Sequence, residues 1–316
     1  LVEQIQSPTN DALRSATPPL PALAIKWSSS FFDNWPIYDS ASIINAAMVA
    51  ATIGVVGITT SQLGGFIAGL ISMLLMLSFP GTLFHARVVG PEGVTMLAFS
   101  LLLWMGTRGP KTLTGSIFAS IIFAGALACH HEAAVMIIPW LAAAILMAQN
   151  DDDGVPLATL LPLLAAPLFL SIMWPFLQGG SHAWIQAFIE PHITPHAPLI
   201  VLGEIHNQSI NSAPSLLDGL LLVLLRTPVV TAILGLLGAL CIFRACARGQ
   251  LPWQRCFVPL SCAALITAQC LNGSLQYDGT DGSARWLPAL AMLGGVGAAR
   301  LLLALLQKKW CTPSGY

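Results

Sequence analysis

Residues 41–80 read ASIINAAMVAATIGVVGITTSQLGGFIAGLISMLLMLSFP, and this stretch decides the class of fold. It contains no Asp, Glu, Lys or Arg. One helix needs only about 20 apolar residues to cross a bilayer, so the stretch is too long for a single crossing. It predicts two spans, 41–60 and 62–80, joined by a tight turn at the polar segment Thr59-Thr60-Ser61-Gln62.

The composition of the whole chain agrees with this interpretation. Of the 316 residues, 55% are hydrophobic and only 9% are charged. A soluble domain carries about 25% charged residues, so this chain lacks the polar side chains that a water-exposed surface needs. The net charge of -1 gives no indication of nucleic-acid binding. The composition therefore predicts a polytopic helical membrane protein.

Apolar runs divide the chain into about nine candidate spans within one integral membrane domain of all-α class. These are residues 41–60, 62–80, 92–107, 112–128, 132–148, 156–177, 226–244, 256–272 and 286–306. We expect an outer loop with an interfacial helix at 1–40, the first six spans within 41–177, a large outer loop at 178–225 and the last three spans within 226–316.

Positive charges predict the orientation, because Lys and Arg favour the cytoplasmic ends of spans. If residues 1–40 lie outside, the inner loops hold Arg108, Lys111, Arg244, Arg248, Arg255, Lys308 and Lys309. The outer segments then hold Arg14, Lys26, Arg87, Arg226 and Arg285. This bias predicts a bacterial inner-membrane protein with residues 1–40 and 178–225 on the periplasmic side.

Histidines and acidic residues follow the same division, although the orientation was not chosen from them. All seven histidines fall in outer segments, and so do eleven of the fourteen acidic residues. The three exceptions are Asp151, Asp152 and Asp153. We therefore expect any active site to face the outer side.

The segment FHARVVGPEG (84–93) places scarce charges between two apolar runs. Glu92 stands at an expected helix start, where the helix dipole favours a carboxylate, and Arg87 could anchor to lipid phosphate. A functional alternative stays open beside this structural one. A carboxylate can orient or deprotonate an acceptor, and an arginine can hold a phosphate through two hydrogen bonds.

The segment His130-His131-Glu132 ends another span on the outer side. A polar helix end is the favoured interpretation, ahead of substrate contact and of metal binding. Adjacent histidines point to different helix faces and make poor joint ligands. His192, His196 and His206 are separated by prolines, so their spacing defines no common face. The sequence indicates no cofactor and leaves a divalent metal open.

A late outer loop, YDGTDGSARWLP (277–288), delivers Arg285 to the start of the last span. Arg285 is equally consistent with a ligand for phosphate or pyrophosphate and with a simple interfacial anchor.

Three motifs in this order resemble the GT-C superfamily of polytopic glycosyltransferases: TPPLPAL (17–23), AR…PE (86–92) and ARWLPALAML (284–293). The similarity is greatest to protein O-mannosyltransferases and lipid A aminoarabinose transferases of glycosyltransferase family 39 type. It implies sugar transfer from a polyprenyl-phosphate donor to a lipid, glycan or protein acceptor. Glu92 would be the acceptor-side carboxylate. The substrate-binding residues implied are Arg87, Arg285, His85, His131 and Tyr277.

The family's acidic motif after the first span has no counterpart here. Asp11 is the nearest acid and the second candidate catalytic residue, but its setting PTNDALRS differs from the family motif. One expectation is an N-terminally truncated enzyme whose catalytic aspartate lies upstream of Leu1. The alternative is a non-catalytic subunit on the same scaffold, packed against other membrane subunits. A transporter is disfavoured, since neither internal repeats nor mid-membrane charges are evident.

Overall fold

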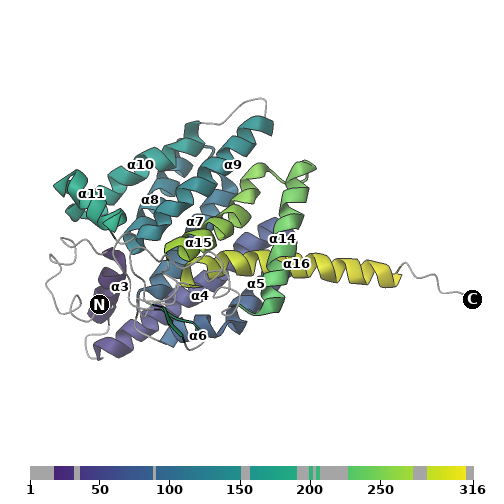
Figure 1. Ribbon diagram of the computed structural model, residues 1–316, viewed down its shortest axis with the longest axis horizontal. Coiled ribbons are helices and arrows are strands. Elements are labelled where there is room, and N and C mark those ends of the chain that lie inside the picture. Colours follow the sequence, from purple (N-terminus) through teal and green to yellow (C-terminus); the bar gives the residue numbers. More distant parts are fainter. Residues whose placement is uncertain are drawn as a thin grey trace, which may run out of the picture.

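The computed structural model describes residues 18–31, 36–87, 90–150, 157–190, 199–201, 204–206, 227–272 and 283–310, and most of them are helical (Figure 1). The α-helices are α3 (Leu20–Phe31), α4 (Ile37–Gly64), α5 (Phe66–Ser78), α6 (Pro80–Arg87), α7 (Glu92–Arg108), α8 (Leu113–Cys129), α9 (Ile137–Asn150), α10 (Leu157–Met173), α11 (Ser181–Phe188), α14 (Val229–Ala247), α15 (Phe257–Asn272) and α16 (Ser283–Trp310). Three short 3-10 helices complete them: η1 (His131–Met136), η2 (Pro175–Gly179) and η3 (Trp253–Cys256).

The expected helical class is confirmed, with one small addition in the large outer loop. Strands β1 (Leu199–Val201) and β2 (Glu204–His206) pair antiparallel, with Leu199 opposite His206. An interfacial helix was expected within residues 18–32, and α3 forms there. The apolar segment 216–225, which ends the large loop, lies outside the described residues.

Each of the nine apolar runs coincides with a helix, but their lengths differ. Among the described residues, four helices are long and apolar enough to cross a membrane: Tyr38–Gly64, His131–Gln149, Val229–Ala247 and Ala284–Leu306. A fifth crossing results if α5 and α6, which meet at a 66° bend, count as one broken span. The chain is thus an integral membrane protein, while nine crossings stay a prediction.

The turn between the first two spans lies later than expected. Helix α4 continues through the polar segment and ends at Gly64, and Gly65 makes the turn with φ of 87°. The hydroxyls of Thr59, Thr60 and Ser61 donate to backbone carbonyls three or four residues earlier. The prediction was wrong because these hydroxyls form hydrogen bonds to their own helix and so do not end it. The turn falls instead at Gly65, because glycine adopts a positive φ readily.

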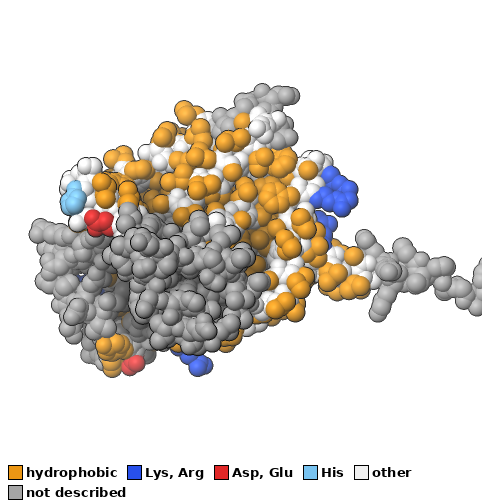
Figure 2. Space-filling view, viewed as in Figure 1, with side chains coloured by type: hydrophobic (Ala, Val, Ile, Leu, Met, Phe, Trp, Pro, Cys, Tyr) orange, Lys and Arg blue, Asp and Glu red, His pale blue; other side chains and the backbone are white. Residues whose placement is uncertain are grey.

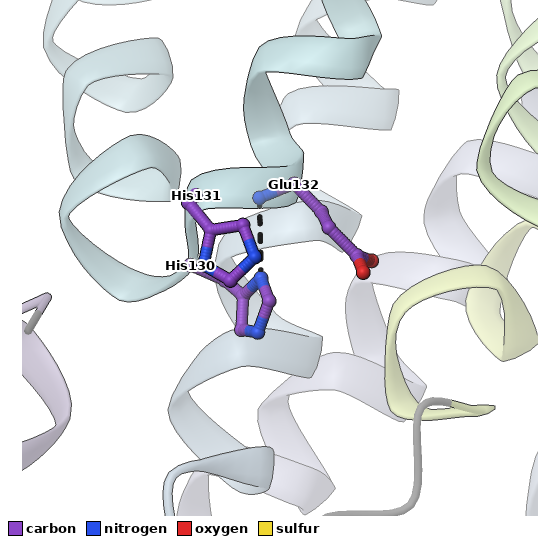
Figure 3. Close-up of side chains that lie close together, drawn as sticks. All are labelled: His130, His131 and Glu132. Atoms are coloured by element: carbon purple, nitrogen blue, oxygen red, sulfur yellow. Dashed lines mark hydrogen bonds between the residues drawn. The ribbon is translucent and has the colours of Figure 1, made fainter. Parts of the chain in front are cut away.

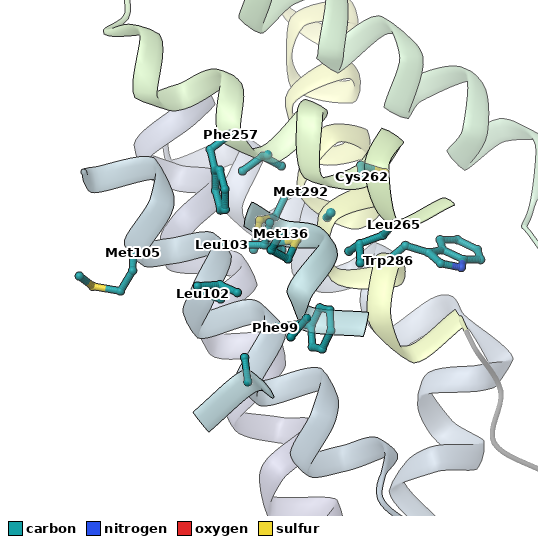
Figure 4. Packing of buried hydrophobic residues seen from close by; sticks show 14 of the residues in the cluster. Phe99, Leu102, Leu103, Met105, Met136, Phe257, Cys262, Leu265, Trp286 and Met292 are labelled. Carbon is teal, nitrogen blue, oxygen red and sulfur yellow. The ribbon is translucent and has the colours of Figure 1, made fainter. Parts of the chain in front are cut away.

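The core lies between helices rather than under a polar surface. Figure 4 shows Phe99, Leu102 and Leu103 of α7 packed near Phe257 and Trp286, and all five side chains are fully buried. The outside is also apolar, and Figure 2 shows hydrophobic side chains over most of the part of this face that is not grey. Such a surface is the one expected where lipid is the solvent.

Helix α16 is surrounded by other helices over its first half. Its residues 284–297 are all buried, and it packs against α4, α5, α7, α14 and α15. Glycines permit the closest approaches: a Cβ on Gly238 of α14 or on Gly297 of α16 would collide with backbone of the facing helix. Small residues of this kind allow helix backbones to approach closely in membranes.

Gly295→Ala should destabilise the bundle, because its Cβ would lie 2.5 Å from the carbonyl oxygen of Ala68 in α5. Overpacking of this kind costs about 1–3 kcal/mol. We expect that loss in the free energy of unfolding measured by SDS titration in mixed micelles. Gly54→Ala is the matched control, since a Cβ there meets no atom within 4 Å. An equal change in both variants would contradict the role assigned to Gly295.

Candidate functional site

A buried ion pair joins two of the segments selected from the sequence. The Arg285 guanidinium lies 2.5 Å from Oε2 of Glu132, and their side chains are only 4% and 0% exposed. Gln269 of α15 donates from Nε2 to the same oxygen at 3.1 Å. Three elements, η1, α15 and α16, are thus held together at one end of the bundle.

The local sequence explains how Glu132 reaches this position. His130 ends α8 in an extended conformation, with φ of -159°, so the chain changes direction there. Its Nδ1 accepts a hydrogen bond from the backbone N–H of Glu132 at 3.2 Å, which caps the start of η1. The carboxylate then faces α15 and α16 rather than the outer surface.

Sequence reasoning missed Gln269 and did not pair Glu132 with Arg285. The available signal for Gln269 was an amide side chain within the largely apolar helix FVPLSCAALITAQCLN. A buried charge is costly without a partner, so the pair and its amide form one electrically balanced unit. Arg285 is therefore bound to a protein carboxylate in this structure.

The neighbouring histidines bear on the metal hypothesis. The rings of His130 and His131 lie 4.3 Å apart, and ligand atoms of the triplet with Glu132 lie within 4.8 Å of one another. Figure 3 shows the Glu132 carboxylate pointing away from both rings. Because the adjacent Arg285 already supplies a positive charge to that carboxylate, the arrangement favours an ion pair over a divalent cation.

A second polar group surrounds the segment 84–93. His85 is 1% exposed and Glu92 is 6% exposed. Asn45 of α4 donates from Nδ2 to the carbonyl oxygen of His85, and its Oδ1 occupies the space beside Gly93. Gly90 lies directly against the Glu92 carboxylate, where any side chain would collide with Oε2. This Asn45–His85–Glu92 cluster therefore links the ends of α4, α6 and α7.

The remaining predicted site residues are placed less closely together. Arg87, the last residue of α6, is exposed, and His131 is half-buried. Asp11 and Tyr277 lie outside the described residues. Helix α16, which carries Arg285, also contacts α6 and α7, the helices that carry His85 and Glu92.

Comparison with known proteins gives a match in structure alone. No family model matches the sequence, and no curated protein does. Two crystal structures of ArnT from Cupriavidus metallidurans match: the apo state, with a TM-score of 0.59 and 15% identity, and the state bound to undecaprenyl phosphate, with a TM-score of 0.58 and 13% identity. The fold is GT-C-like.

The match covers 92% of this chain but only 51% and 53% of the two ArnT chains. The chain therefore spans about half the length of these proteins. The GT-C-like fold expected from TPPLPAL, AR…PE and ARWLPALAML is confirmed, although identity remains low. The fold, with its apolar helical body, is similar to that of ArnT over this part of its length.

Removing one member of the buried Glu132–Arg285 pair should strongly destabilise the protein. Arg285→Met would leave the Glu132 carboxylate buried without its cation, which costs about 3–5 kcal/mol. We expect that loss in the free energy of unfolding, measured by SDS titration. The double variant Glu132→Gln/Arg285→Met should be more stable than Arg285→Met alone, because it leaves no buried charge without a counter-ion. Arg87→Met, at an exposed arginine, is the control and should change stability by at most about 0.5 kcal/mol.

Proposed function

We propose that this chain forms the membrane part of a glycosyltransferase that uses a polyprenyl-phosphate sugar donor. The observation that carries the proposal is a buried glutamate, Glu92, at the start of α7 in a GT-C-like fold. One of the similar ArnT structures holds undecaprenyl phosphate, a lipid of the donor's chemical class. The acceptor would be a lipid, glycan or protein reached from the periplasmic side.

Glu92 would act on the acceptor. In the transfer, the acceptor oxygen or nitrogen forms a bond to the anomeric carbon while the bond from that carbon to the phosphate oxygen breaks. The acceptor loses its proton, and a nearby carboxylate can take it. The N-terminal end of α7 favours the ionised carboxylate that this role needs.

Arg87 would act on the donor. The leaving polyprenyl phosphate gains negative charge as the glycosidic bond breaks, and a guanidinium can neutralise it through paired hydrogen bonds. Arg87 is exposed at the end of α6, five residues before Glu92. Arg285 takes a different part in this proposal: it pairs with Glu132 and acts as a positioning residue for the start of α16.

A second candidate is a non-catalytic subunit with a GT-C-like scaffold, serving a larger membrane complex. The buried Glu132–Arg285 pair favours it, because the charge of one candidate phosphate ligand is already balanced within the protein. The two candidates differ in whether Glu92 matters for turnover or only for packing.

Glu92→Gln should abolish most transfer. Loss of a general base lowers the rate about 10²–10⁴-fold, so we expect kcat to fall at least about 100-fold with polyprenyl-phosphate sugars. The matched control is Asp39→Asn, an exposed acid at the same end of the bundle. Full activity in Glu92→Gln would remove Glu92 from the mechanism, and an inactive but folded wild-type chain would favour the subunit.

Arg87→Gln should weaken donor binding more than it slows chemistry. A hydrogen bond to a charged group contributes about 1.5–3 kcal/mol, so the KM for the donor should rise about 10-fold or more. Lys26→Gln in α3 is the control and should leave that KM unchanged. An unaltered KM in Arg87→Gln would show that the donor phosphate lies elsewhere.

A further inference from the structure

A pair of arginines lies at the end of the bundle opposite the candidate site. Arg255 belongs to the short helix η3, and Arg108 ends α7. The two segments are in contact, since Gly109 packs against the Gln254 side chain. Arg255 also reaches α4, where its Nη1 donates to Oε1 of Gln62 at 3.5 Å.

Arg255 has unused hydrogen-bonding capacity. Its Nε is buried and has no hydrogen-bond partner, and its bond to Gln62 is long. Burial lowers the pKa of Arg255, and the positive charge of Arg108 lowers it further. The two arginines therefore repel one another, and within the described ranges no carboxylate forms an ion pair with either.

Arg108 is held in place by an aromatic ring. Its guanidinium carbon lies 4.3 Å above the centre of the Trp104 ring, while the residue remains exposed. A cation–π contact orients a guanidinium without consuming its N–H donors. Arg108 can therefore still bind an anion in the plane of its five donors.

The described charges at this end have the same sign, while Asp151, Asp152 and Asp153 lie outside the described residues. Among the described residues, the loops at this end also carry Lys111, Arg244 and Arg248, and no carboxylate forms an ion pair with any of these cations. Figure 2 shows Lys and Arg side chains gathered beside α14, with acidic and His side chains on the opposite side of the view. These described cations favour an anionic ligand at this end.

Helix dipoles explain part of this arrangement but not all of it. Helices α4, α7 and α14 end here, and their C-terminal carbonyls favour nearby cations. Arg108, in the last turn of α7, is well placed for that role. Arg255 is not, because its Nε has no hydrogen-bond partner and its Nη1 donates to the side-chain amide of Gln62.

We propose that Arg255 and Arg108 bind a phosphate-type oxyanion, supplied by the headgroup of an anionic phospholipid. Guanidinium groups match phosphate oxygens in geometry, and basic sites between membrane helices bind such headgroups. The lipid source is favoured because the neighbouring helix α8 begins with the exposed apolar Leu113. This inference does not depend on the proposed glycosyltransferase activity.

Binding can be measured on the full chain in non-ionic detergent by isothermal titration calorimetry. The probes are dihexanoyl-phosphatidylglycerol and, separately, inorganic phosphate. Arg255→Gln should weaken phosphatidylglycerol binding about 10-fold or more, as expected for loss of a charge-assisted hydrogen bond. Arg300→Gln is the matched control, since Arg300 is exposed on α16, and it should bind as the wild type does.

Arg108→Gln provides a second variant, because its exposed side chain is dispensable for folding. Helicity and gel-filtration profile establish that each variant is folded. Binding of inorganic phosphate alone, lost in Arg255→Gln, would support the oxyanion site and overturn its lipid source. Binding of neither probe, or equal weakening in Arg300→Gln, would overturn the site itself.

Discussion

The close crossing of α16 with α5 and α14 is the constraint on which the rest of this structure depends. Residues 284–297 of α16 are buried on every side, and this is possible only because glycines remove side chains at the contact points. In lipid, no hydrophobic effect drives helices together, so close van der Waals packing must do so. Gly295 and Gly297 thus place the start of α16, and Arg285 with it, against the other helices.

The position of α16 determines which charged and polar side chains meet at one end of the bundle. Its first turn carries Arg285 to Glu132, and the helix contacts α4, α6 and α7, which carry Asn45, His85 and Glu92. One acid is balanced by a cation within the protein, while Glu92 lies at a helix start that stabilises its charge. Two glutamates at the same end thereby acquire different environments, and Glu92 is the one to which the proposed function assigns work on a substrate.

The two ends of the bundle differ in charge for reasons that sequence counting anticipates. Charged residues avoid the apolar interior, so the order of spans and loops decides the end at which each one lies. The GT-C-like fold was likewise predictable, because TPPLPAL, AR…PE and ARWLPALAML occur in the order the family shows. The polar segment at Thr59-Thr60-Ser61 misled the prediction of the first turn, since its hydroxyls bond to their own helix.

Hydropathy is a property of each residue, and so the sequence by itself determined the membrane class, the positions of the helices and the separation of charge between loops. Which polar groups meet is a property of packing. Gln269 and Glu132 are 137 residues apart, and Arg255 and Gln62 are 193 residues apart. Such contacts depend on the rotation and spacing of neighbouring helices, which small side chains such as Gly295 set. Only the tertiary structure could therefore show that Arg285 is paired internally while Arg255 retains an unused donor.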